Sequence, residues 1–124
     1  MFRLMVIVVL TAVLFLAPKP GAAADAAAGQ VIFNRCKICH SLEPGKSIVG
    51  PSLHGIFGRK AGTADNFTYS EAMKSSGIVW DDGALEKYLH NPGAVVPGNK
   101  MAFPGLKDDT QIADLLAYLH QAAQ

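Results

Sequence analysis

Two cysteines and a histidine stand close together in this chain, in the order Cys36-Lys37-Ile38-Cys39-His40. Thiols at this separation can bond to two points along one edge of a porphyrin, and the next residue can then present its imidazole to the iron. The Cys-x-x-Cys-His pattern is typical of covalent attachment of c-type haem. We therefore predict one haem c, joined through thioether bonds from Cys36 and Cys39, with His40 as an iron ligand.

Other uses of the motif stay open on the residues alone. A redox-active dithiol has the same spacing, but it normally follows a strand, and no strand pattern precedes Cys36. A structural zinc site needs four protein ligands, and the chain holds only two cysteines. An ordinary disulfide is a third alternative in an exported protein. Haem attachment is favoured because His40 follows the second cysteine directly.

The iron then needs a second axial ligand or has an open site. The candidates are two methionines and three histidines, namely Met73, Met101, His54, His90 and His120. Met101 is favoured because it lies in a segment rich in Pro and Gly that can fold back over the open haem face. Met73 is better explained as a core residue, and we expect the three histidines to be exposed or hydrogen-bonded.

The elements that must position these groups are helical. Apolar periodicity and capping residues predict three main helices at about 25–36, 82–90 and 110–121, with Asp81 as the N-cap of the second. A short helical turn is predicted at 70–75. Gly and Pro recur through 41–66 and 93–107, which therefore read as loops. The predicted fold class is all-α, with long loops wrapped round one haem.

The first 24 residues predict a secretory signal peptide. Arg3 precedes an apolar run, which ends in a Pro/Gly break and an Ala-x-Ala site. We expect cleavage before Asp25, a single domain over 25–124, and a periplasmic location. An uncleaved membrane anchor is the alternative, but the run is shorter than the roughly 20 residues that span the hydrocarbon core.

The net charge of the chain limits the classes of partner that it can bind. The whole chain has a formal net charge of +1, and cleavage would remove Arg3 and Lys19 and leave −1. The chain contains no block of basic residues, so we expect no binding to nucleic acid.

The mature chain resembles mitochondrial cytochrome c and its soluble bacterial relatives, the class I cytochromes c. The resemblance runs in order through most of the chain. Its landmarks are Gly29, Phe33, 36–40, 50–55, 57–60, 67–70, Trp80, 88–89, 97–101 and 115–119. It implies the small class I fold. It also implies that the Pro51 carbonyl accepts the second N–H of His40, that Met101 is the sixth ligand, and that the Tyr88 hydroxyl steadies the Met101 sulfur.

The resemblance implies further roles and shows some departures. Arg59, Tyr69 and Trp80 would hold a haem propionate, and Gly29 and Phe33 would pack on Leu115 and Tyr118. Met73 stands where the family often has Asn, and Asn99, kept as a site residue, stands where Thr is common. The loop at 41–49 is shorter than in the mitochondrial form. The family's ring of lysines is represented only in part, by Arg35, Lys46, Lys60, Lys87 and Lys100.

The predicted function is single-electron transfer without substrate turnover, because an iron with two protein ligands has no free position. The resemblance implies brief docking of a monomer, at the exposed haem edge, on larger redox proteins. These would be a cytochrome bc complex and a terminal oxidase or photosynthetic reaction centre. A dedicated electron acceptor for a periplasmic dehydrogenase is one alternative. A peroxidase-like or gas-binding haem protein is the other, if Met101 is not a ligand.

Overall fold

The computed structural model describes residues 23–124, so the predicted signal peptide lies outside the described residues except for its last two positions. The helices are α1 (Ala26–Phe33), α2 (Glu71–Lys74), α3 (Asp82–His90), α4 (Pro92–Val95) and α5 (Asp109–Ala122). Over the same residues, strand-like pairing is limited to isolated bridges between His40 and Ser47 and between Lys60 and Val79. The predicted all-α class is confirmed. None of the helices in the described part is long and apolar enough to cross a membrane.

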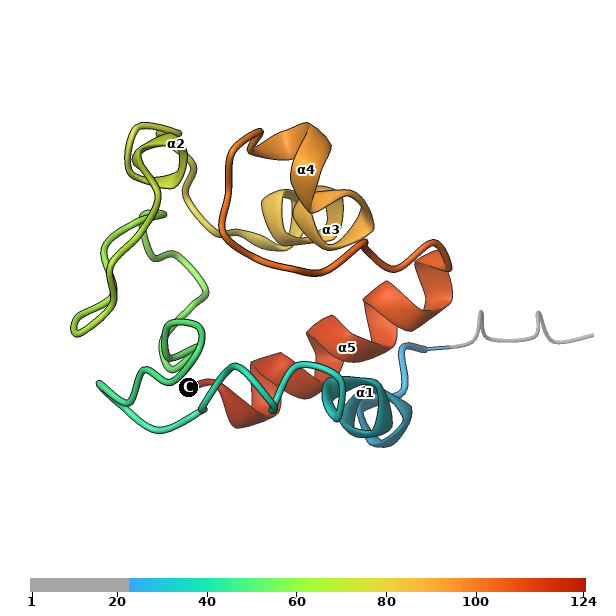
Figure 1. Cartoon of the computed structure of the whole chain (residues 1–124). Helices are drawn as coiled ribbons and strands as arrows, with labels where there is room; N and C mark the ends of the chain where they lie inside the picture. The colour runs from blue at the N-terminus through green and yellow to red at the C-terminus, as the bar shows by residue number, and fades with distance from the viewer. Residues whose placement is uncertain (1–22) are drawn as a thin grey trace, which may run out of the picture.

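The first and last helices, α1 and α5, pack across each other (Figure 1). Gly29 lies at this crossing. A Cβ there would overlap the backbone carbonyl of Asp114, so only glycine lets the two helices pack this closely. Phe33 packs on Tyr118, with ring centroids 5.4 Å apart, which confirms the predicted contact between the two helices. The Asp25 backbone N–H also donates to Oδ1 of Asp114 at 2.7 Å, a polar tie that the sequence did not reveal.

Helix α1 begins as predicted but ends early. The carboxylate of Asp25 accepts the backbone N–H groups of Ala27 and Ala28 at 2.9 and 3.2 Å, which satisfies two free donors of the first turn. The helix ends at Phe33 rather than at Cys36, because the chain tightens there into bonds between residues three apart, such as Cys36 N–H to the Phe33 carbonyl at 2.8 Å. The predicted end was therefore wrong, and the cysteines lie in turns after the helix.

Helices α3 and α5 follow their sequence signals closely. Helix α3 has the predicted bounds, and the Asp81 side chain accepts the Ala84 N–H at 2.7 Å. Helix α5 begins after the N-cap Asp108 and runs slightly beyond both predicted ends. An acidic N-cap satisfies free N–H groups and lies near the positive end of the helix dipole, so both starts are set by local chemistry.

The two short helices were less fully predicted. Helix α2 is the expected turn, capped by Ser70, whose hydroxyl accepts the Met73 N–H at 3.1 Å. Helix α4 lies partly in the segment predicted to be loop, and that prediction was wrong for residues 93–95. Asn91 accepts the Ala94 N–H at 3.3 Å, and Pro92 occupies the first helical position, where no N–H is needed. The proline thus ends one helix and begins the next.

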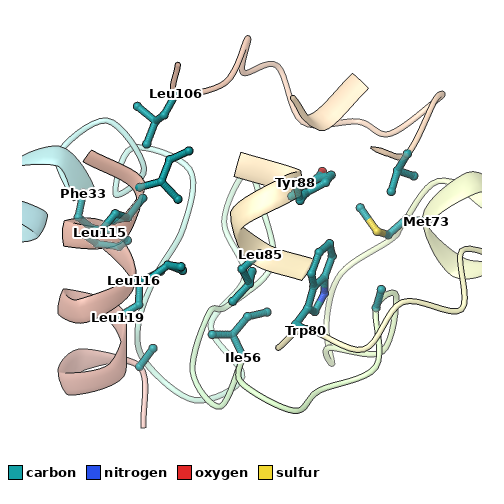
Figure 2. Packing of buried hydrophobic residues seen from close by; sticks show 14 residues of the cluster. Phe33, Ile56, Met73, Trp80, Leu85, Tyr88, Leu106, Leu115, Leu116 and Leu119 are labelled. Atoms are coloured by element: carbon teal, nitrogen blue, oxygen red, sulfur yellow. The ribbon is translucent and has the colours of Figure 1, made fainter. Parts of the chain in front are cut away.

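The buried core lies between α5 and α3. Figure 2 shows Leu115, Leu116 and Leu119 on α5 and Leu85 on α3, which all belong to one buried cluster. Met73 belongs to the same buried cluster and is 9% exposed, as predicted for a core residue. The cysteine motif follows α1 on one side of this core, and the segment that holds Met101 follows α4.

Candidate functional site

The two cysteines lie in a turn that places them near each other. The Cys39 N–H donates to the Cys36 carbonyl at 3.0 Å, and both thiols are half-buried and free of a disulfide. Burial raises the pKa of the Cys36 thiol, against a smaller opposite effect of Arg35. A redox-active dithiol needs a lowered thiol pKa, so this geometry does not favour that alternative.

His40 is oriented by a backbone carbonyl. Its Nδ1 lies 2.7 Å from the Pro51 carbonyl oxygen, which can only accept, so Nδ1 carries the proton and donates. Burial lowers the pKa of His40, while the bond to Pro51 acts in the opposite direction. The imidazole is therefore neutral, and its Nε2 keeps a lone pair for a metal. Such a bond also makes a ligating imidazole more basic.

Gly50 also helps to fix the His40 ring, a role that the sequence analysis did not assign to it. A Cβ at this position would lie 2.6 Å from Cε1 and 2.9 Å from Nδ1 of the His40 ring, so only glycine lets the backbone pass this close. The Gly50 N–H also donates to the Cys39 carbonyl at 2.8 Å. The Gly before Pro51 is the one signal in the sequence that could have indicated this contact.

Met101 is half-buried and packs partly against the core. Its backbone N–H donates to Oδ1 of Asn99 at 2.8 Å. The amide nitrogen of Asn99 in turn donates to the carbonyls of Val96 and Pro92 at 2.9 and 3.2 Å. Asn99 thus shapes the loop that carries Met101, and its own contact with a cofactor stays a prediction.

The other candidate ligands are occupied or lie elsewhere. His120 Nε2 lies 2.7 Å from Asp82 Oδ1, and its ring stacks on Phe57 with centroids 3.7 Å apart. His90 is exposed at the end of α3, and His54 is half-buried in a loop. His120 and His90 therefore lie as expected, hydrogen-bonded and exposed, whereas the half-buried His54 side chain fits neither description.

Arg59 and Tyr69 lie close together in the long loop. Two Arg59 nitrogens donate to the carbonyls of Ser52 and His54 at 3.0 and 3.1 Å. Burial lowers the pKa of Arg59, and nearby Tyr69 acts in the opposite direction. The Tyr69 oxygen accepts the Ala64 N–H at 3.1 Å and keeps its own proton for donation. The guanidinium has five N–H donors, so several are left for a carboxylate.

Trp80 and Tyr88 supply two more donors. Both are buried, at 6% and 7% exposure, with ring centroids 5.0 Å apart (Figure 2). The Trp80 backbone pairs with Gly58 and Arg59, at 2.7 and 2.9 Å, which places Trp80 beside Arg59. Burial raises the pKa of Tyr88 to about 12, so its hydroxyl keeps the proton.

The side-chain donors of Trp80 and Tyr88 test whether a large cofactor fits. Neither donor bonds to another residue within 23–124. No fully enclosed side-chain nitrogen or oxygen lacks a partner in that range, so both donor atoms keep some accessible surface. Unused donors inside an apolar core suit a planar apolar group that carries carboxylates. Together with two thiols and a free imidazole nitrogen, they fit haem c.

Comparisons with known proteins give relatives that match most of the described chain. The family model described as "Cytochrome c" matches residues 26–123. "Cytochrome c2" of Blastochloris viridis is 48% identical over 103 residues, or 82% of this chain and 81% of that protein. "Cytochrome c2" of Rhodomicrobium vannielii is 50% identical over 99 residues, or 79% of each. The structure of cytochrome cH from Methylobacterium extorquens matches with a TM-score of 0.75 and 46% identity, covering 79% of this chain and 99% of that chain.

Proposed function

Because the chain belongs to the cytochrome c family, we propose that His40 and Met101 bind its haem iron from opposite sides. The expected class I fold and the covalent haem c on Cys36 and Cys39 are confirmed, and the chain is an electron carrier. The observation that supports His40 best is the bond from its Nδ1 to the Pro51 carbonyl, which leaves the other nitrogen of that ring, Nε2, free to bind a metal.

The residues around His40 and Met101 act mainly by fixing the orientation of these two side chains. The haem supplies an iron that gains and loses one electron when it is bound. His40 is fixed by Pro51 and by the close backbone of Gly50, so its ring keeps one orientation in both oxidation states. Asn99 fixes the backbone of Met101. A thioether ligand favours the reduced state and raises the potential.

Three side chains would receive the carboxylates of the cofactor. Arg59 keeps unused N–H groups after its two bonds to backbone carbonyls. Tyr69 and Trp80 each keep one donor. A buried carboxylate is costly unless it is paired and hydrogen-bonded, so this cation and the two neutral donors meet that need.

We also propose that the chain is exported, that residues 1–24 are a signal peptide, and that the mature domain is 25–124. The tie between Asp25 and Asp114 supports this cleavage position. Cleavage before Asp25 turns its backbone N–H into an ammonium group at the atom that lies 2.7 Å from the Asp114 carboxylate. A charge-assisted bond of this kind is stronger than a neutral one. N-terminal sequencing of the secreted protein tests it, and a start at Met1 would favour the anchor.

The identities of the electron donor and acceptor are proposals too. We propose a monomer without substrate turnover that moves electrons from a cytochrome bc complex to a terminal oxidase or a photosynthetic reaction centre. Reduction kinetics with purified donors test this route. Preferential reduction by a periplasmic dehydrogenase would replace it by the more specialised role.

The ligand assignment is tested by two matched substitutions. Met101→Leu and Met73→Leu both replace a methionine by a side chain of similar volume. We expect Met101→Leu to lower the midpoint potential by at least about 0.1 V, a part of the ~0.8 V range that axial ligands cover. Carbon monoxide should then bind the reduced protein. Met73→Leu should leave both properties nearly unchanged.

Two results would contradict the assignment. One is carbon monoxide binding to the unmodified reduced protein, which would indicate an open site and the gas-binding alternative. The other is a larger loss of potential in Met73→Leu than in Met101→Leu.

A further inference from the structure

A buried serine, Ser52, directly follows the residue that accepts the His40 hydrogen bond. Ser52 is 3% exposed, and it has no role in the site as described so far. A buried hydroxyl costs free energy unless it is hydrogen-bonded. The bonds that Ser52 makes therefore indicate what this side chain does.

The Ser52 hydroxyl joins two segments of the chain. Its Oγ donates to the Glu43 carbonyl and accepts the His54 N–H at 3.2 Å, which uses both capacities of a hydroxyl. Glu43 lies three positions after His40, and His54 lies three positions after Pro51. The hydroxyl thus fastens the segment that follows the imidazole to the segment that follows its acceptor.

Backbone bonds join the same two segments on either side of the imidazole. The Gly50 N–H donates to the Cys39 carbonyl at 2.8 Å, and the Leu53 N–H donates to the Ser41 carbonyl at 2.9 Å. Pro51 lies between these bonds and has no N–H of its own to donate. The position of its carbonyl therefore depends on the residues around it.

Ser52 also fixes the peptide group that contains the Pro51 carbonyl. That carbonyl and the Ser52 N–H belong to one planar unit. On the other side of the Ser52 Cα, the Ser52 carbonyl accepts Nη2 of Arg59 at 3.0 Å. With its side chain and its carbonyl both bonded, Ser52 restrains the rotation of the planar unit before it.

We propose that Ser52 is a positioning residue for electron transfer. Its hydroxyl holds the Pro51 carbonyl 2.7 Å from Nδ1 of His40 and so sets how strongly the imidazole donates to the iron. This inference rests on the proposed function, in which His40 is an iron ligand. A strong bond from Nδ1 makes the imidazole more basic, and hydrogen bonds of this kind tune the potential of the iron. Since a more basic ligand favours the oxidised iron, loss of the hydroxyl should favour the reduced iron.

The test compares Ser52→Ala with Ser76→Ala. The two serines make the same pair of bonds, because the Ser76 hydroxyl donates to the Met73 carbonyl at 2.9 Å and accepts the Ile78 N–H at 3.4 Å. Ser76 lies just beyond α2, and its bonds do not reach His40 or Pro51. Each substitution removes a single oxygen atom, so both variants should fold and take up haem.

Two properties of the holoprotein are measured. The first is the midpoint potential. The second is the rate at which the Nδ1 proton of His40 exchanges with solvent in the reduced protein, followed by nuclear magnetic resonance. It is compared with the exchange of the Leu115 amide proton in the same sample. Leu115 lies in the core on α5, so the comparison separates a local change at His40 from a general loss of stability.

We expect Ser52→Ala to shift the equilibrium between oxidised and reduced protein about threefold toward the reduced form, as a weakened hydrogen bond does. The Nδ1 proton should exchange faster relative to the Leu115 amide. Ser76→Ala should leave the potential and the relative exchange rate unchanged, even where it lowers the melting temperature.

Two outcomes would overturn the inference. One is an unchanged potential and relative exchange rate in Ser52→Ala, which would leave Ser52 a role in stability alone. The other is an equal shift in Ser76→Ala, which would show a general effect of a lost hydroxyl. Failure of the proposed function is distinct. In that case the His40 ring protons of the unmodified reduced protein would lack the large ring-current shifts of a ligand beneath a porphyrin.

Discussion

The two sides of the site are held in different ways. On one side, His40 is fixed at its ring by a hydrogen bond to the Pro51 carbonyl and by the close backbone of Gly50. On the other side, Met101 is held through its backbone, whose N–H donates to Asn99 and whose carbonyl accepts the Phe103 N–H, while its sulfur has no hydrogen bond to another described residue. A ring nitrogen that is already bonded cannot turn away, whereas a thioether on a flexible side chain can. When the fold is perturbed, we therefore expect Met101 to leave its position before His40 does.

The largest expected effect concerns the His40 side. Gly50→Ala places a methyl group within 2.6 Å of the ring, so the ring must move and its bond to Pro51 must weaken. We expect a loss of about 3 kcal/mol in the free energy of unfolding, at the upper end for overpacking. Chemical denaturation of the holoprotein measures it. Gly83→Ala is the control, since its Cβ meets nothing closer than 3.7 Å. Equal losses of unfolding free energy in the two variants would contradict a special role for Gly50.

A pH effect is next in size. The folded chain holds the Tyr88 pKa at about 12, above the usual 10.0. Between these values the unfolded chain loses a proton that the folded chain keeps, so stability falls as pH rises through this window. The loss should be on the order of 2 kcal/mol by pH 12. Unfolding curves at rising pH for the unmodified protein and Tyr88→Phe measure it, and the same slope in both would contradict it.

The Met101 side should respond more in ligand binding than in stability. Asn99→Ala removes the acceptor of the Met101 N–H and both bonds to the α4 region. We expect about 1.5 kcal/mol of destabilisation and measurable binding of carbon monoxide, which the unmodified reduced protein should not show. Optical titration of the reduced protein measures the affinity. If Gly50→Ala opened the iron to carbon monoxide more than Asn99→Ala did, the order of the two sides would be reversed.

The smallest effect should come from a contact outside both sides. His120→Ala removes an exposed bond to Asp82 and the stack on Phe57. Exposed pairs of this kind are worth about 0.5 kcal/mol, and neither His40 nor Met101, the proposed axial ligands, contacts this pair. Thermal unfolding and the midpoint potential should both stay near those of the unmodified protein. A changed potential would show that the site depends on α5 more directly than its two ligands suggest.

Local signals explain what was predictable. The cysteine motif, the bounds of α3 and the acidic caps each depend on residues within a few positions of one another. The end of α1 and the existence of α4 were missed because tight turns at Asn34 and a proline at a helix start differ little from loop in sequence. The role of Gly50 and the tie from Asp25 to Asp114 depend on contacts across the fold, which no local pattern contains.

The crossing of α1 and α5 has a consequence for how the molecule is made. It joins Asp25 to Asp114, which are 89 positions apart, so α1 has nothing to pack against until nearly the whole chain is present. A growing chain therefore keeps its cysteines accessible for most of its synthesis. Haem can therefore be attached to Cys36 and Cys39 before α5 packs on α1 and completes the core around the cofactor.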